Sequence, residues 1–242
     1  MSLATLYSRA CCGIAAPQVT VEVHLANGLP SLAIVGLPET AVKESRERVR
    51  AALLSSGFEF PARRVTINLA PADLPKQGGR YDLAIALGIL AASGQLKGQG
   101  LNDYEIVGEL ALTGEIRPVS GILPLAMQSR RADRTLILPA DNAEEAALIQ
   151  GLPLLPVRNL LEVCAHLNGS RAMTVLSGQG GACPAGEGQA DLADIHGQHH
   201  AKRALEIAAA GGHSLLMIGP PGTGKTMLAS RLPGILPPMS EA

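Results

Sequence analysis

One motif near the C-terminal end constrains the fold more than any other feature of the sequence. The run Gly219-Pro-Pro-Gly-Thr-Gly-Lys-Thr226 matches the P-loop pattern, which forms a phosphate-binding loop only between a strand and a helix. Before it, Ser214–Ile218 is a short apolar run that favours a buried strand, and after it Met227–Leu232 contains helix-forming residues. The chain is therefore predicted to place this motif in an α/β domain.

The residue types of the motif point to ATP and Mg²⁺ as ligands. Gly219, Gly222 and Gly224 allow a tight turn in which successive N–H groups face phosphate oxygens. Lys225 can reach the β- and γ-phosphates, and the Thr226 hydroxyl can ligate Mg²⁺. The alternative, a Gly/Pro-rich loop that merely turns, fits less well because every constrained position is filled. The predicted nucleotide-binding residues are Gly219, Pro220, Pro221, Gly222, Thr223, Gly224, Lys225 and Thr226.

Composition limits the partners of the chain. Its 20 basic residues are balanced by 21 acidic ones, so no large basic footprint for DNA or an anionic membrane is expected. With no Trp, two Phe and three Tyr, it offers few platforms on which bases could stack. The N-terminus lacks the features of a signal peptide, and no run of about 18 apolar residues predicts a membrane span. A cytoplasmic protein is predicted.

Cysteine and histidine positions give no metal site by spacing. Four cysteines, Cys11, Cys12, Cys164 and Cys183, match neither a zinc knuckle nor a CxxC pair, which favours incidental reduced thiols. Three histidines, at 196, 199 and 200, stand around the predicted start of a helix. We predict that they are exposed residues at the start of this helix rather than metal ligands.

Periodicity outlines an N-terminal domain of mixed strands and helices. Val19–Leu25 alternates as a strand, and Asn27-Gly28 predicts a hairpin turn to a return strand at Leu32–Val35. Further strands are predicted at Val65–Ala70, within Tyr104–Val119, and at Thr135–Leu138 and Leu154–Val157. Helices are predicted at Glu39–Ser56, Asp82–Ser93 (buried), Ile122–Ala132, Asn142–Gln150, Leu160–Leu167 and His199–Ala210.

A change of composition suggests where that domain ends. The stretch Ser177–Gln189 is small, polar and Gly-rich, too poor in apolar residues to bury a core. We therefore predict a domain at 1–170, a linker at 171–190, and the start of a second domain at 191–242.

Several segments resemble a known family. The stretch Asp191–Thr226 resembles the start of a magnesium-chelatase-like AAA+ module, and Gly36–Arg50 and Asn68–Leu83 are similar to the YifB/ComM group of bacterial proteins. The resemblance covers essentially the whole chain. It implies an AAA+ ATPase acting on DNA as a hexameric branch-migration helicase in natural transformation or recombination. The implied fold is α/β: an N-terminal α+β domain like the Lon protease (ribosomal-protein domain-2-like), then the start of a P-loop AAA+ domain.

The Lon-like resemblance also identifies two positions where proteolytic residues are missing. In Pro75-Lys-Gln-Gly-Gly-Arg80, Arg80 stands where the family has its nucleophilic Ser. In Thr113-Gly-Glu-Ile-Arg-Pro-Val-Ser-Gly-Ile-Leu123, Leu123 stands where the family has its Lys. A Ser–Lys dyad needs both an attacking hydroxyl and an amine to take its proton. The resemblance therefore implies a proteolytically inactive domain, retained for assembly or DNA contact.

Three arginines are candidates for contact with DNA phosphate, namely Arg63, Arg64 and Arg80. Arg46, Arg48 and Arg50 fit a solvated helix face better, because Glu44 and Arg48 have the i,i+4 spacing of an ordinary ion pair. Arg80 differs in that it lies in a Gly-rich loop rather than in a regular charge pattern.

The sequence ends at Ala242, soon after Lys225, and so before the acidic strand, sensors and arginine finger of an AAA+ ATPase. We expect a fragment or shortened product that binds nucleotide weakly and does not hydrolyse it. Three other functions stay open: a non-catalytic interaction module that joins hexamers of a longer relative, a magnesium-chelatase subunit, and, least favoured, a Lon-type peptidase.

Overall fold

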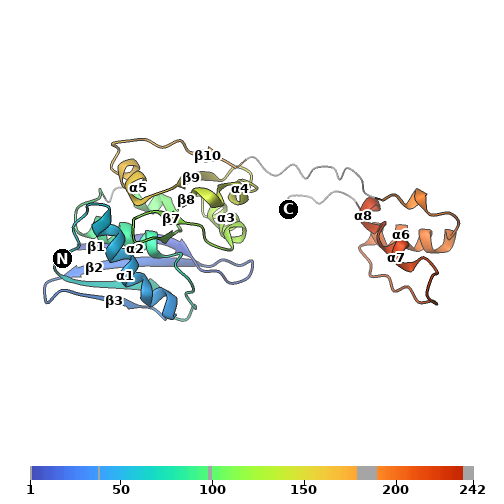
Figure 1. The fold of residues 1–242 in the computed structure, drawn as a ribbon, viewed down its shortest axis with the longest axis horizontal. Coiled ribbons are helices and arrows are strands. Elements are labelled where there is room, and N and C mark those ends of the chain that lie inside the picture. The colour runs from blue at the N-terminus through green and yellow to red at the C-terminus, as the bar shows by residue number, and fades with distance from the viewer. Residues whose placement is uncertain (1, 38, 98–99, 179–189, 237–242) are drawn as a thin grey trace. The chain divides into compact units, whose positions relative to one another are not determined.

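The computed structural model describes residues 2–37, 39–97, 100–178 and 190–236. Two compact units divide the chain, Met1–Gly181 (the N-terminal unit) and Ala182–Ala242 (the C-terminal unit). Figure 1 shows a sheet with helices in the first unit and a smaller group of helices in the second. The division falls within 171–190, where the sequence predicts a linker, and residues 179–189 of that stretch lie outside the described ranges.

The N-terminal unit alternates strands and helices. In chain order these are β1 (Ser2–Arg9), β2 (Gln18–Ala26), β3 (Ser31–Val35), α1 (Thr40–Ser55), β4 (Arg64–Ala70), α2 (Asp82–Ala92), β5 (Tyr104–Ile106), β6 (Glu109–Leu110), β7 (Ile116–Arg117), α3 (Ile122–Arg131), β8 (Thr135–Pro139), α4 (Ala143–Ala146), β9 (Pro153–Val157), α5 (Leu160–Leu167) and β10 (Leu176–Ser177). The predicted helices are confirmed, although the helix expected at Asn142–Gln150 is reduced to a 3₁₀ turn and the short α4. The C-terminal unit contains α6 (His199–Gly211), α7 (Lys225–Ala229) and α8 (Leu232–Ile235).

Within the described residues, one mixed sheet of eight strands runs in the order β10-β9-β8-β5-β1-β2-β4-β3. The predicted hairpin between β2 and β3 is wrong. Strand β4 lies between them, antiparallel to β2 and parallel to β3. After Asn27-Gly28 the chain therefore crosses to the far side of β4 instead of turning back to pair with β2. A two-residue turn signal cannot reveal a strand that is inserted later in the chain.

Both ends of the N-terminal unit hold strands that the sequence analysis did not predict. β1 pairs with β2 over its whole length, from Ser2 opposite Leu25 to Arg9 opposite Gln18, and it also pairs in parallel with β5. Its central place joins the antiparallel and parallel parts of the sheet. At the other end, Leu176 and Ser177 pair with β9 and therefore belong to the sheet rather than to a linker.

Helices cover the sheet unequally. Alternate residues of β8 enter two separate cores, with Ile137 in the core under α1, α2 and α5, and Leu136 and Leu138 in the core under α3 and α4. By contrast, β2 alternates between buried and half-buried residues, which is typical of a strand with one covered face. The confirmed buried helix α2 is the centre of the larger core.

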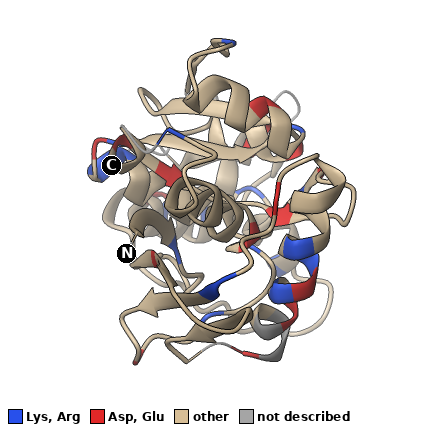
Figure 2. Cartoon of the chain, turned by 90° about the vertical axis from the view of Figure 1, so that its left-hand side faces the viewer, with Lys and Arg blue, Asp and Glu red and all other residues tan. Residues whose placement is uncertain are grey.

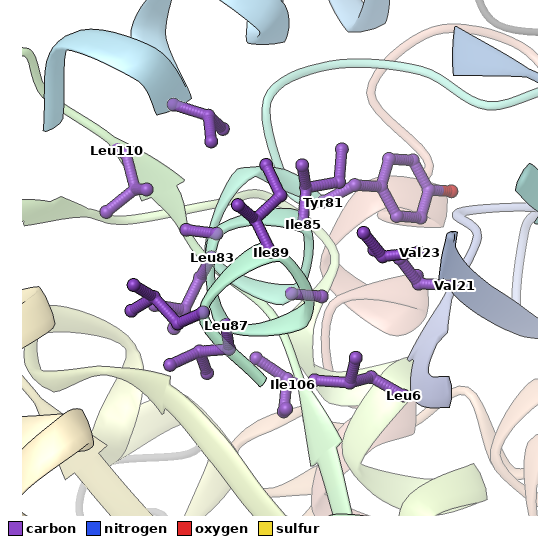
Figure 3. Close-up of a cluster of buried hydrophobic side chains, with 14 of the residues drawn as sticks. Leu6, Val21, Val23, Tyr81, Leu83, Ile85, Leu87, Ile89, Ile106 and Leu110 are labelled. Carbon is purple, nitrogen blue, oxygen red and sulfur yellow. The ribbon is translucent and has the colours of Figure 1, made fainter. Parts of the chain in front are cut away.

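Helix α2 packs unusually close to the sheet. Figure 3 shows its apolar side chains surrounded by Leu6, Val21, Val23, Ile106 and Leu110. At Gly88 an added Cβ would lie 2.6 Å from Val23 Cγ2 and 3.0 Å from Leu6 Cδ1. A glycine at this point is what allows the helix backbone to approach the strands.

A buried ionic network ties β1, β5 and α3 together. The fully buried Glu105 carboxylate accepts hydrogen bonds from Arg9 Nε at 2.6 Å and Arg9 Nη2 at 2.7 Å. Arg134 Nη1 lies 3.2 Å from the same carboxylate, and Ser129 also donates to it. Arg134 further stacks over the Tyr7 ring, 3.9 Å from its centroid. The buried charge is thus paired and hydrogen-bonded, as stability requires.

A second buried pair corrects the interpretation of α1 as a purely solvated charged face. Arg48 does lie 3.8 Å from Glu44, but its Nε donates to the fully buried Asp82 at 2.8 Å. Burial raises the pKa of Asp82, while the hydrogen bond from Arg48 opposes that rise. Arg48 therefore holds α1 to the start of α2, a contact between distant segments that the i,i+4 pattern could not predict.

The C-terminal unit has a small core made by Leu192, Ile195, Leu205 and Leu228. On α6, Leu205 and Ala208 are both buried. The strand predicted at Ser214–Ile218 is not formed: these residues are described but pair with no other strand in the described part of the chain. A strand is stable only against a neighbour, and the apolar side chains of Leu216 and Ile218 are exposed.

Candidate nucleotide-binding site

The predicted phosphate-binding loop lies at the surface of the C-terminal unit. Gly222 and Gly224 adopt left-handed φ values of +81° and +78°, and α7 begins at the next residue, Lys225. These φ values are rarely accessible to residues with a side chain, so the glycines set the shape of the turn. Thr223 Oγ1 closes the loop by donating to the Pro220 carbonyl at 2.9 Å.

Lys225 is held by the loop itself. Its Nζ donates to the carbonyl oxygens of Gly219 at 2.8 Å and Pro220 at 2.7 Å, and lies 3.3 Å from Thr223 Oγ1. All of these partners are exposed, so the ammonium group sits on the rim of the loop. A phosphate group arriving at the loop would meet a cation whose present partners are neutral, and a charge-assisted bond to phosphate is the stronger one. Thr226, the predicted Mg²⁺ ligand, is also exposed.

A hollow of about 510 Å³ adjoins the loop. One wall is α6 with Ala201 and Ala204, another is the segment 215–218, and Lys225 and Leu228 complete it. Its lining is mainly apolar with a polar end at the loop. That combination suits a ligand with one apolar part and one charged part.

Gln198 is a site residue that the sequence analysis missed. It stands in the left-handed conformation at the start of α6, and its Nε2 donates to the Thr223 carbonyl at 3.1 Å. It therefore ties the N-terminus of α6 to the phosphate-binding loop. No periodicity or spacing signals this contact, because it joins positions 25 residues apart.

The histidine interpretation is compatible with the structure. His199 and His200 are exposed at the start of α6, and the described residues contain no group of three or more His, Cys, Asp or Glu side chains placed to hold a metal ion. Cys11 is exposed and Cys164 is buried, whereas Cys183 lies outside the described residues. Burial raises the pKa of the Cys164 thiol to about 12.

In the N-terminal unit, the structure brings the segments of Arg80 and Leu123 together. Arg80 lies just before α2, and its Nη2 donates to the Ser120 carbonyl at 3.2 Å, three residues before Leu123 in the first turn of α3. Leu123 is half-buried and its amide donates to Glu145 at 3.2 Å. Neither side chain has a hydroxyl or an amine, so a Ser–Lys dyad is impossible at these two positions.

The three arginines predicted to contact DNA differ in exposure. Arg63 and Arg64 are exposed at the start of β4, whereas Arg80 is only 6% exposed. Burial argues against direct contact between Arg80 and a phosphate backbone. In Figure 2, basic and acidic residues are interspersed over the visible face, as the near-neutral charge predicts.

Comparison with known proteins decides the family. Residues 21–142 match the model for "Subunit ChlI of Mg-chelatase", and residues 191–242 match "Magnesium chelatase, subunit ChlI". YifB of Salmonella typhimurium is 57% identical over 241 residues, which is 100% of this chain and 47% of that protein. Competence protein ComM of Haemophilus influenzae is 53% identical over 244 residues, which is 100% of this chain and 48% of that protein. The chain belongs to the magnesium-chelatase-like family of YifB and ComM.

Within this YifB/ComM family member, the N-terminal unit is Lon-protease-like and the C-terminal unit begins a P-loop domain. The Lon protease of Chloroflexus aurantiacus is 30% identical over 159 residues, which is 60% of this chain and 19% of that protein. The chain spans about half the length of the YifB and ComM relatives. No helix in the described ranges is both long and apolar enough to cross a lipid bilayer.

Proposed function

We propose that this YifB/ComM family member binds ATP with Mg²⁺ at residues 219–226. The observation that most directly supports this proposal is the exposed loop beside an apolar hollow. In this loop Lys225 Nζ donates to the carbonyls of Gly219 and Pro220. Lys225 would receive the β- and γ-phosphates, and the Thr226 hydroxyl would ligate Mg²⁺. The apolar wall formed by α6 suits the base. Mg²⁺ would neutralise phosphate charge that the loop alone cannot balance.

A fluorescent ATP analogue tests this proposal on the 242-residue chain. Lys225→Ala is expected to weaken binding at least about tenfold, the effect of losing one charge-assisted contact to phosphate. Arg203→Ala is the matched control, because Arg203 is an exposed cation on α6 paired with Glu206. Equal loss in both variants, or no loss in Lys225→Ala, would place nucleotide binding elsewhere.

For the whole protein we propose ATP-driven action on DNA, as a homo-hexamer in the cytoplasm that moves strands or branches. Support comes from the family and from the name of the competence protein ComM. The 242 residues hold the P-loop but no acidic strand after it, so we expect nucleotide binding without turnover from these residues alone. ATP turnover by the purified chain, stimulated by DNA, would contradict that part of the proposal.

Arg63 and Arg64 are the proposed contacts of the N-terminal unit with DNA phosphate. Each phosphate contact contributes about 0.9 to the slope of log K against log salt concentration on duplex DNA. Anisotropy of a labelled duplex should therefore show a slope lowered by about 2 in the doubly substituted Arg63→Ala, Arg64→Ala chain. Arg80→Met is expected to leave the slope unchanged. An unchanged slope in the double variant would move the DNA contact to another surface.

A second candidate is a role in inserting Mg²⁺ into a porphyrin, because both matching family models carry the magnesium-chelatase description. The Lon-like N-terminal unit favours the first candidate. Porphyrin binding to the chain, measured by the shift of its absorption band, would favour the second.

A further inference from the structure

Arg80 is a buried cation with too few partners. Its guanidinium is as deeply buried as that of Arg9, since both residues are 6% exposed. Arg9 donates to both oxygens of Glu105 and to two backbone carbonyls. Arg80 donates only from Nη2, to Ser120, while its Nε and Nη1 are buried without a hydrogen-bond partner among the described residues. These two atoms carry most of the five N–H donors of an arginine.

Arg80 also forms no ion pair with a carboxylate in the described part of the chain. Each of the other buried or half-buried arginines of the N-terminal unit, Arg9, Arg48 and Arg134, lies within 4.0 Å of a buried carboxylate. The Glu109 carboxylate lies close to the backbone of Gly79, the residue before Arg80. Its ion pair, however, is with Arg117, at 4.0 Å. An uncompensated buried charge costs several kcal/mol, so a counter-charge is expected.

The surroundings of Arg80 come from three segments that meet near the surface. Ser120 and Gly121 precede α3, and a Cβ on Gly121 would lie 2.9 Å from Cys11 Sγ in the loop after β1. Ser120 and Cys11 are exposed, whereas Arg80 itself is only 6% exposed. The hydroxyl of the following residue, the buried Tyr81, likewise has no hydrogen-bond partner among the described residues, and Figure 3 shows its ring pointing away from the α2 axis.

We propose that Arg80, with the Tyr81 hydroxyl, binds one small oxyanion, a phosphate or a carboxylate group, between these segments. The planar guanidinium matches the paired oxygens of either group, and a neutral tyrosine donates a further hydrogen bond. Burial limits the ligand to a small molecule or a single terminal group, because a polymer backbone cannot reach a side chain that is 6% exposed. This site is separate from the P-loop and does not rest on the proposed function.

The test uses inorganic phosphate and acetate as probes, each against sodium chloride at equal ionic strength. The full chain carries Lys225→Ala throughout, so that the P-loop does not contribute. All three tyrosines, Tyr7, Tyr81 and Tyr104, lie in the N-terminal unit, so the midpoint of thermal unfolding by tyrosine fluorescence reports this unit alone. Binding at about tenfold excess over Kd should raise that midpoint by about 3 °C or more.

Arg80→Met should abolish the response to both anions, and without added anion it should unfold no earlier than the parent chain, because it removes an uncompensated charge. Arg46→Met, a substitution at an exposed arginine of α1, should keep the full response. If Arg80→Met does not fold, Arg80→Lys carries the test: it keeps the charge, loses the planar fork, and should show a smaller response.

The two probes separate the sources of the oxyanion. A rise with phosphate alone assigns a phosphate group, and a rise with acetate alone assigns a carboxylate, and both support the site. Equal responses in the parent and Arg80→Met chains, or no response to either anion in the parent chain, overturn it.

Discussion

In the N-terminal unit, the Arg9–Glu105 contact of 2.6 Å is buried on both sides, whereas in the C-terminal unit the Arg203–Glu206 contact of 2.9 Å joins two exposed side chains. The distances are almost equal, but the environments differ. In the buried pair each charge has lost its water and depends on its partner, while in the exposed pair water replaces a lost partner at little cost. Removing one partner is therefore expected to destabilise the first unit much more than the second.

The same contrast explains why the C-terminal unit is the better place for a ligand. Lys225 bonds only neutral oxygens of an exposed loop, so an incoming phosphate exchanges those bonds without opening a core. In the N-terminal unit the buried Arg9 and the half-buried Arg48 and Arg134 are already paired with buried carboxylates, and Arg80 is the one buried arginine of the described ranges without a carboxylate.

The largest expected effect comes from Glu105→Gln. It keeps the shape but leaves Arg9 and Arg134 buried without a counter-charge, and the unfolding free energy of the N-terminal unit should fall by about 3–5 kcal/mol. Urea unfolding followed by tyrosine fluorescence measures it. A loss below about 1 kcal/mol would break the contrast between the two units.

The second-largest loss of stability is expected where α2 packs closely against the sheet at Gly88. In Gly88→Ala the new methyl group meets Val23 and Leu6, which should cost about 1–3 kcal/mol of overpacking, more than the gain of up to about 1 kcal/mol in helix propensity. The same urea titration measures the net loss. In a Val23→Ala background the alanine at 88 has room, so its cost should shrink or change sign. The same cost in both backgrounds would show that the approach of α2 to the sheet is not the cause.

A smaller, pH-dependent effect is expected at Lys76. Desolvation lowers the pKa of its fully buried ammonium, although Asp73 opposes this. Because the folded pKa lies below 10.5, the unfolded chain binds more protons between the two pKa values, so stability should rise with pH in that window. Lys76→Met lacks this rise. Its stability at pH 7 should exceed that of the parent chain, with the difference narrowing at pH 10, both measured by urea unfolding; a difference that widens would contradict the sign.

The smallest effect on stability is expected at the exposed ion pair of the C-terminal unit. Glu206→Gln removes an exposed i,i+3 partner of Arg203, and the change should stay below about 0.5 kcal/mol. Hydrogen exchange of the amides of α6 measures it locally. A loss as large as that from Glu105→Gln would mean that exposure does not distinguish the two pairs.

The sequence by itself determined the local features of this protein. The P-loop motif determines its own turn, because the glycines at 222 and 224 adopt φ values that residues with a side chain rarely reach. The uniform apolar run of α2 predicts a buried helix, and α2 is buried. The positions of most strands and helices followed from their periodicity. The missing Ser–Lys dyad was also readable, since it depends only on which residues stand at 80 and 123.

Tertiary structure alone decided which segments became neighbours. The central strand β1, the insertion of β4 between β2 and β3, and the pairing of Arg48 with Asp82 join residues that are distant in sequence. Gln198 at the P-loop and the burial of Arg80 have the same origin. Local pattern reports how a segment prefers to fold, but exposure and partners depend on what the rest of the chain packs against it, and those contacts carry no signal at either position alone.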